Sequence, residues 1–300
     1  MHEPGDEFGL IDAIVEALGD RTAGRWVSVG PGDDCAVITP TANHDVVSSI
    51  DTLVESVHFP TDAPPALVGY RALMVSLSDL AAMAADPRYV MVAVSLPTFD
   101  LNWAVEFAKG MRKAAQQTDV YVCGGNIARG PLTITISVHG EVPGGQALLR
   151  DAACVGDGIF VSGPLGGAAA CVRRGSLDVV DGHTLDTLQR AYYCPSARVD
   201  LCEEVRSNAS AGIDVSDGLV QDLGHILDAS GVGAHLDSAS IPVNENATRD
   251  DALYGGDDYE LLCTARTLPS FVRIGEVVSR RGILLDGVEV EARGFNHFVA

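Results

Sequence analysis

The stretch LTITISVHG, residues 132–140, decides the fold class of this chain. Apolar residues at positions 132, 134, 136 and 138 alternate with threonine or serine at 133, 135 and 137. Alternation with a period of two is typical of a β-strand that buries one face. The stretch therefore predicts a sheet with one covered face and one open face of small polar residues.

Helix and strand patterns follow each other on both sides of this strand. Helices are predicted over 10–18, 65–84, 102–116, 166–174, 184–193, 197–208 and 218–229. Further strands are predicted over 26–29, 35–38, 46–50, 89–96, 120–123, 158–162, 233–236, 259–264 and 271–276, and Asp286-Gly287 predicts a hairpin. The composition shifts at EVPGGQ, residues 141–146. We therefore predict an α+β fold with mixed sheets, divided into an N-terminal domain over 1–145 and a C-terminal domain over 146–300.

Composition excludes several classes of protein. The 300 residues include 41 acidic and 20 basic side chains, a formal net charge of −21, which disfavours binding to nucleic acid. No apolar run reaches the roughly 18–20 residues of a membrane helix, and the acidic start MHEPGDEFGL does not resemble a signal peptide. Seven scattered cysteines without a CxxC pair indicate reduced thiols, neither a disulfide framework nor a zinc site. These features predict a cytoplasmic protein.

Aspartates gather at predicted strand ends, often beside glycine. They are Asp33, Asp34, Asp51, Asp214, Asp217, Asp257 and Asp258, and Asp79 joins them from a predicted helix. Glycine lets the backbone turn tightly, and the short aspartate side chain can hold an ion. Converging carboxylates raise each other's pKa unless a cation neutralises them. Hard oxygen ligands suit Mg²⁺, so the pattern indicates an acidic site for a divalent metal in a cleft.

Each motif has an ordinary alternative explanation. GDD fits a surface turn, Ser216 and Asp217 in DVSDG could cap the next helix, and Asp79 could face solvent. GGNIARGPL, with Arg129, is a candidate phosphate loop or a plain turn. The chain has no P-loop, no protein-kinase HRD or DFG signature and no EF-hand spacing. All the ordinary explanations would have to hold at once, which favours the metal site.

Seven segments, in this order and near this spacing, resemble thiamine-monophosphate kinases of the AIR synthetase-like superfamily. They are GPGDDCAV, IDTLVESVHF, LSDLAAMAADPRY, GGNIARGPLTITISVHG, GDGIFVSGPLG, GIDVSDGLVQDLGHIL and GGDDYELLCT, and the resemblance extends over about residues 8–298. It implies phosphorylation of thiamine monophosphate by ATP, the last step in making thiamine diphosphate, with several Mg²⁺ ions. It also implies a homodimer that forms through the N-terminal sheet, and a C-terminal domain that closes the active-site cleft.

The resemblance assigns roles to residues at matching positions. Asp34, Ser49, Ile50, Asp51, Asp79, Asn126, Asp214 and Asp217 match metal positions, and Asp51, Asp79 and Asp214 are the expected catalytic carboxylates. Gly125, Asn126, Arg150 and Ser216 match positions that contact ATP, and His58, Asp257 and Phe295 match positions that line the thiamine phosphate pocket. Apart from the resemblance, His58 and Phe295 fit ordinary core packing equally well.

Three features depart from the family pattern. Asn126 stands where many relatives have aspartate, Asp257 replaces a commoner glutamate, and the segment from Thr264 to Phe295 is short. Many relatives have threonine at position 50. Isoleucine has no side-chain oxygen, so Ile50 could bind a metal only through its backbone carbonyl. Two other functions remain open: another ATP-using member of the superfamily, and a catalytically silent regulator that binds nucleotide or metal.

Overall fold

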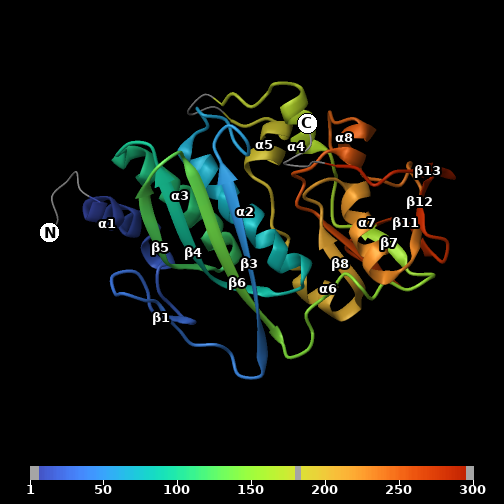
Figure 1. Cartoon of the computed structure of the whole chain (residues 1–300), viewed down its shortest axis with the longest axis horizontal. Coiled ribbons are helices and arrows are strands. Elements are labelled where there is room, and N and C mark those ends of the chain that lie inside the picture. The colour runs from blue at the N-terminus through green and yellow to red at the C-terminus, as the bar shows by residue number, and fades with distance from the viewer. Residues whose placement is uncertain (1–6, 180–183, 295–300) are drawn as a thin grey trace. The chain divides into compact units, whose positions relative to one another are not determined.

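The computed structural model describes residues 7–179 and 184–294, which form two compact units. The first unit contains residues 7–80, 86–144 and 177–179. The second contains residues 81–85, 145–176 and 184–294. Figure 1 shows the elements of both units in chain order.

The first unit is built on a four-stranded mixed sheet in the order β3-β6-β4-β5, with β4 and β5 parallel and the other pairs antiparallel. Its elements are α1 (Glu7–Leu18), η1 (Gly19–Arg21), β1 (Val27–Val29), β2 (Val37–Ile38), β3 (His44–Val54), α2 (Pro65–Ala82), β4 (Asp86–Leu96), α3 (Leu101–Thr118), β5 (Tyr121–Arg129) and β6 (Thr133–Pro143). Helices α2 and α3 lie behind this sheet in Figure 1. The mixed sheets of the sequence prediction are confirmed here and in the second unit.

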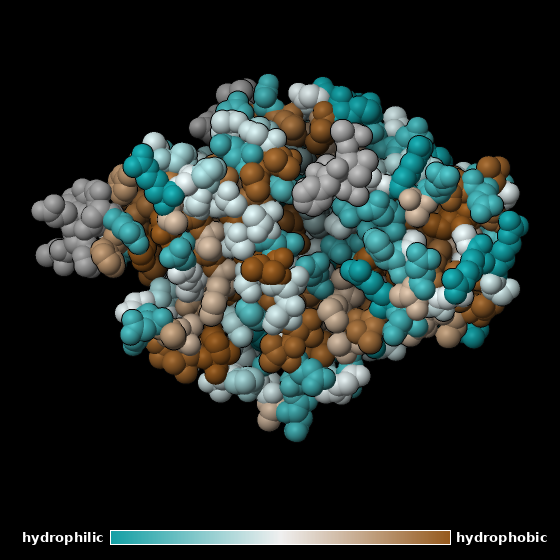
Figure 2. Space-filling view, viewed as in Figure 1, coloured by the Kyte–Doolittle hydropathy of each residue, from teal (hydrophilic) through white to brown (hydrophobic). Residues whose placement is uncertain are grey.

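Strand β6 has the alternation that the sequence predicts. Ile134, Ile136 and Val138 are fully buried, and the residues between them are less buried. Ile50 on β3 and Met91 on β4 are both paired with Ser137 of β6, so they share the opposite face, where they are 64% and 41% exposed. Figure 2 shows brown and pale residues intermixed over this sheet. One face of the sheet is therefore packed and the other is open.

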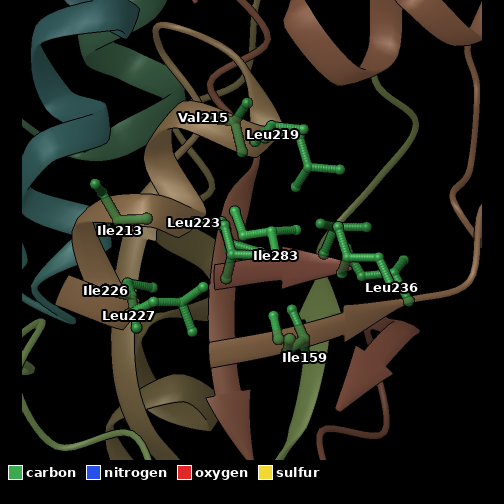
Figure 3. Packing of buried hydrophobic residues seen from close by; sticks show 14 of the residues in the cluster. Ile159, Ile213, Val215, Leu219, Leu223, Ile226, Leu227, Leu236 and Ile283 are labelled. Carbon is green, nitrogen blue, oxygen red and sulfur yellow. The ribbon is translucent and has the colours of Figure 1, made fainter. Parts of the chain in front are cut away.

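The second unit is built on a seven-stranded mixed sheet in the order β13-β12-β9-β11-β7-β10-β8. Its elements are β7 (Gly158–Val161), α4 (Gly167–Arg173), α5 (Thr187–Tyr193), η2 (Val199–Leu201), α6 (Cys202–Asn208), β8 (Ala209–Asp214), α7 (Leu219–Ser230), β9 (Gly233–Leu236), α8 (Arg249–Tyr254), β10 (Leu261–Ala265), β11 (Val272–Val278), β12 (Gly282–Leu285) and β13 (Val288–Val290). Helix α7 packs Leu219, Leu223 and Ile226 against Ile159 and Ile213 of the sheet, as Figure 3 shows. This apolar layer fixes the position of the loop between β8 and α7.

Two details of the sequence prediction are confirmed. Asp286 and Gly287 have φ values of 51° and 83° and connect the antiparallel strands β12 and β13, as the predicted hairpin requires. All seven cysteines are free thiols, and four of them are buried. None of the helices in residues 7–179 and 184–294 is long and apolar enough to span a membrane.

Two other details differ from the sequence prediction. Strand β5 does not end before Gly-Gly-Asn but continues to Arg129, because each residue from Gly124 to Arg129 is paired with a residue of β4. The loop conformation predicted for this segment is therefore wrong, and its contact with phosphate stays a prediction. Helix α8 was not predicted, because its six residues are too few to show a helical period.

Helix α8 provides a test of stability. Asp251 at its third position accepts hydrogen bonds from the backbone and hydroxyl of Thr248, both at 2.7 Å, and from two nitrogens of Arg173 at 2.8 and 2.6 Å. These partners, Arg173 foremost, lower the pKa of Asp251 to about 2. We expect Asp251→Asn to lower the free energy of unfolding by about 1–2 kcal/mol at pH 7, measured by chemical denaturation.

This effect has a defined pH dependence. A carboxyl with a lowered pKa in the folded state stabilises the fold above its unfolded pKa of about 3.9, and the stabilisation is lost as the pH falls toward 2. The difference between the parent and Asp251→Asn should therefore shrink below about pH 4. The exposed neighbour Asp250 is the matched control, and an equal loss in Asp250→Asn would contradict the assignment.

Candidate functional site

The acidic cluster of the first unit contains Ser49, Asp51 and Asp79. Ser49 and Asp51 lie two residues apart on β3, so their side chains point to the same side of the sheet. The Ser49 hydroxyl donates to Oδ2 of Asp79, in the last turn of α2, over 2.5 Å. The alternative in which Asp79 faces solvent without a partner is therefore wrong.

The two carboxylates of this cluster influence each other. The pKa of Asp51 is raised to about 6, first by burial and then by the negative charge of Asp79, and a hydrogen bond with Ser76 opposes the increase. Two close carboxylates and a hydroxyl supply oxygen atoms, which are the donors that Mg²⁺ prefers. A bound cation would remove the repulsion that raises the Asp51 pKa. These residues therefore fit a magnesium ion.

Asp34 and Ile50 are two other metal positions predicted in the first unit. In the described part of the chain, no hydrogen bond or ion pair joins Asp34 to Ser49, Asp51 or Asp79; the backbone N–H of Asp34 donates to Oδ1 of Asp33 at 2.9 Å. Ile50 points to the open face of the sheet, away from its neighbours Ser49 and Asp51. No group of three or more His, Cys, Asp or Glu side chains in residues 7–179 and 184–294 is arranged to hold a metal ion, and the wider set of metal positions stays a prediction.

Gly125 and Asn126 lie on β5, opposite Val92 and Ala93 of β4. A Cβ atom at Gly125 would lie 2.0 Å from the carbonyl oxygen of Val92, so only glycine allows this pairing. Asn126 is exposed, which leaves its amide available to a ligand. These residues are therefore presented by a paired strand rather than by a loop.

His58 follows β3 in a tight turn. Its Nδ1 accepts the backbone N–H of Val54 at 2.9 Å, while its own backbone N–H donates to the Val54 carbonyl at 2.9 Å. The acceptor role of Nδ1 means that a neutral ring carries its proton on Nε2. The turn therefore orients the half-buried His58 ring.

The acidic cluster of the second unit is formed by two loops. Asp214 ends β8 and is buried, and Ser216 and Asp217 follow it. The Ser216 carbonyl accepts the backbone N–H of Asp257 at 2.8 Å. A Cβ atom at Gly256 would lie 2.4 Å from the same carbonyl, so glycine permits the approach. The sequence motifs DVSDG and GGDDYEL are therefore adjacent in space.

Asp222 holds the first of these loops, and the sequence analysis missed it. Its Oδ2 accepts the backbone N–H groups of Ser216, Asp217 and Gly218 at 3.0, 3.1 and 3.1 Å. The N-cap of α7 is Gly218, so the alternative in which Ser216 or Asp217 caps this helix is wrong. Burial raises the Asp222 pKa to about 6; the three backbone hydrogen bonds oppose this increase, and the charge of Asp217 adds to it. An acidic residue in the first turn of a predicted helix was the available signal.

The second loop has a constrained backbone. Asp257 and Tyr259 have φ values of 71° and 53°, and the Tyr259 hydroxyl donates to Oδ1 of Asp257 at 2.8 Å. Between them, Asp258 accepts the backbone N–H of Gly166 at 2.9 and 2.8 Å, and burial raises its pKa well above the usual value. Left-handed backbone at non-glycine residues is strained and persists only when the surroundings fix it. The Asp257 carboxylate is therefore held in a defined place.

Arg150 and Phe295 are the remaining residues that the sequence assigns to the substrates. The carbonyl of Arg150 accepts the Ser230 hydroxyl at 2.9 Å, and within the described residues its exposed side chain has no ion-pair partner. Phe295 lies outside the described residues. Arg150 therefore adds no side-chain ion pair to the second cluster within the described residues, and the role of Phe295 stays a prediction.

Comparisons with known proteins find similarity over most of the chain. Residues 32–142 match the family model "AIR synthase related protein, N-terminal domain", and residues 155–285 match the corresponding C-terminal domain. The thiamine-monophosphate kinase of Escherichia coli (strain K12) is 39% identical over 272 residues, which cover 87% of this chain and 83% of that protein. The chain belongs to the thiamine-monophosphate kinase family.

Solved structures of this family agree with the sequence match. The crystal structure of thiamine-monophosphate kinase from Stenotrophomonas maltophilia K279a has a TM-score of 0.85 and 39% identity, covering 95% of this chain and 98% of that one. AaThiL complexed with AMPPCP and TMP has a TM-score of 0.80 and 29% identity, covering 99% of both chains. The family and the two-domain fold predicted from the seven segments are therefore confirmed.

Proposed function

We propose that this protein transfers the γ-phosphoryl group of ATP to thiamine monophosphate, giving ADP and thiamine diphosphate. The observation that carries this proposal is the match to thiamine-monophosphate kinases over almost the full length of the chain. A relative solved with AMPPCP and TMP supports the same pair of substrates. The acidic clusters of both units supply the kind of residues that this reaction needs.

The reaction proceeds by direct in-line transfer. A phosphate oxygen of thiamine monophosphate forms a bond to the γ-phosphorus while the bond from that phosphorus to the bridging oxygen breaks, and the electron pair leaves with ADP. The attacking oxygen is already ionised near neutral pH, so no strong general base is needed. Catalysis then depends on positioning and charge neutralisation. No phosphorylated protein forms, and trapping labelled phosphate covalently on the chain would contradict this step.

The charge neutralisation requires magnesium bound by carboxylates. Magnesium ions held in the first unit by Ser49, Asp51 and Asp79 would screen the phosphate charge when bound. The wider set that the family resemblance assigns to metal is Asp34, Ile50 (through its carbonyl), Asn126, Asp214 and Asp217. An amide oxygen carries no charge, so Asn126 binds a cation more weakly than aspartate would. The remaining aspartates keep the site strongly acidic.

The substrates are bound by the other assigned residues. Gly125, Asn126, Arg150 and Ser216 contact ATP, while His58, Asp257 and Phe295 line the pocket for thiamine monophosphate. Support for the second set comes from Asp257, whose carboxylate is fixed by Tyr259 and can face the cationic thiazolium ring. The hydrogen bond from Val54 to Nδ1 fixes the ring of His58 in one orientation, which suits a residue that lines a pocket.

The decisive experiment measures ADP release from MgATP with thiamine monophosphate, thiamine or the aminoimidazole ribotide precursor, and identifies the product by mass. We expect turnover with thiamine monophosphate alone, and its loss in EDTA. Turnover with another phosphate or acid would favour a different superfamily activity. Binding of MgATP by folded protein without any ADP release would favour a silent regulator.

The open face of the four-stranded sheet supports a homodimer, in a protein that we place in the cytoplasm. Ile50 and Met91 expose apolar side chains in the middle of this face, where a second copy would cover them. We expect Met91→Glu to convert a dimer into a monomer, measured by light scattering after size exclusion, because a buried charge opposes association. Val288→Glu, at a 67% exposed position on β13, is the control. A monomeric parent protein would contradict this arrangement.

A further inference from the structure

The two lysines of this chain lie together. Every other basic side chain in the 300 residues is arginine, and Lys109 and Lys113 are four residues apart on α3. Residues at this spacing are neighbours on one face of a helix. Both line a single groove of about 560 Å³ between α1 and α3, which lie side by side in the first unit (Figure 1).

The groove exists because its α1 wall is built from small residues. Ala13 and Ala17, one turn apart on α1, face Val105 and the lysines of α3 across the groove. A larger side chain at either alanine would occupy the space. The volume is within the range of small-molecule sites, roughly 300–1,000 Å³. The site is therefore large enough for a compact ligand rather than for a single ion.

The charges around the groove are predominantly positive. Lys109, Arg112 and Lys113 line it together with one carboxylate, that of Glu16. The Lys113 ammonium lies 5.5 Å from the centroid of the Tyr70 ring, and no carboxylate within the described residues pairs with it. Lys109 has only an exposed partner, Glu106, at 2.6 Å. Such surface pairs are weak, so both ammonium groups remain available to a ligand.

Arg112 is the third cation that lines the groove. Its terminal nitrogen donates to Asp20 at 3.1 Å, while its Nε is buried without a hydrogen-bond partner. Because this Nε is covered by the protein, Arg112 contributes positive charge to the groove rather than a hydrogen bond from Nε. Glu106 and Asp20 accompany Lys109 and Arg112, so Lys113, which has no carboxylate partner in the described residues, is the cation most available to a ligand.

We propose that the groove between α1 and α3 binds a small polyanion, such as a diphosphate, a phosphate ester or a polycarboxylate. Lys109 and Lys113 contact its charged groups, and the apolar wall of α1 packs against its body. A polyacidic macromolecule is disfavoured, because the chain as a whole would repel it. The groove residues are distinct from those assigned to ATP, thiamine monophosphate and metal, so the site does not depend on the proposed activity.

The lysine composition allows a selective test. Reductive methylation with ¹³C-formaldehyde labels Lys109, Lys113 and the α-amino group of the full chain, and dimethylated lysine keeps its positive charge. The labelled protein is titrated in EDTA, at constant ionic strength, with inorganic pyrophosphate, inorganic phosphate and citrate, and methyl signals are followed by NMR. We expect both lysine signals to shift together and to saturate with pyrophosphate or citrate, more tightly than with phosphate.

Two variants distinguish specific binding in the groove from nonspecific electrostatic attraction of anions. Ala17→Leu fills the groove but keeps all its charges, and it should weaken binding by about tenfold or more; the exposed Ala42→Leu should leave it unchanged. Lys113→Gln should weaken binding reported by the Lys109 signal by about tenfold, since a charge-assisted hydrogen bond is lost. Shifts that never saturate, or saturable shifts that survive Ala17→Leu, would overturn the proposal.

Discussion

Replacing Asp51 or Asp79 with asparagine is expected to lower kcat by about a hundredfold to a thousandfold. Each substitution removes one negative oxygen donor from the cluster formed by Asp51, Asp79 and Ser49. The magnesium concentration that gives half-maximal rate should also rise, because fewer charges hold the ion. Steady-state kinetics over a magnesium series measures both changes.

The Tm of each variant shows whether the loss of activity results from misfolding. Burial and the charge of Asp79 raise the pKa of Asp51 to about 6, so the ionised carboxylate is unfavourable in the folded protein without metal. Asp51→Asn should therefore leave the Tm in EDTA unchanged or higher while activity falls. The matched control is Asp12→Asn on α1, an exposed position outside the cluster. Near-normal turnover in both cluster variants would refute the metal assignment.

The sequence predicts best where a pattern is local and long. The alternation over 132–140 identifies β6 because each of its apolar residues is buried on one face. The aspartates beside glycine mark real loop contacts, since the DVSDG and GGDDYEL segments bond to each other through Ser216 and Asp257. Residue types at a turn therefore carried information about the site.

Prediction fails where a partner strand decides the structure. Gly124 and Gly125 have low strand propensity, so the segment after residue 123 was expected to turn. Pairing with β4 overrides this preference, and it holds Gly125 against Val92 too closely for any side chain. No single-sequence pattern reports on such a neighbour, because the contact joins residues more than thirty positions apart.

The sequence analysis also misses short helices and buried side chains that hold loops, because tertiary contacts define both. Helix α8 is six residues long and is defined by its capping box between Thr248 and Asp251, not by an apolar stripe. Asp222 looks like a solvent-facing acid in a helix, but the fold turns it toward three backbone N–H groups. Its function as an anchor is a property of tertiary structure.

Asp222→Ala is expected to cost about 3 kcal/mol in the free energy of unfolding and to lower kcat at least tenfold. The substitution leaves the N–H groups of Ser216, Asp217 and Gly218 without their common acceptor. Buried donors without partners are costly, so the loop should relax. Because Ser216 and Asp217 are assigned to ATP and metal, a relaxed loop misplaces both, and errors of about 1 Å reduce rates strongly.

Asp222→Asn separates positioning from charge. The amide oxygen can still accept from the loop, and asparagine has no charge for burial to oppose, whereas burial raises the pKa of Asp222 to about 6. We therefore expect the asparagine variant to recover most of the stability and rate that alanine loses, whereas a residue that binds metal directly would not tolerate the change. Asp228→Ala, exposed on the same helix, is the control for helix effects. If Asp222→Asn were as inactive as Asp222→Ala while remaining folded, the carboxylate itself would take part in the reaction, and its assignment as a positioning residue would be wrong.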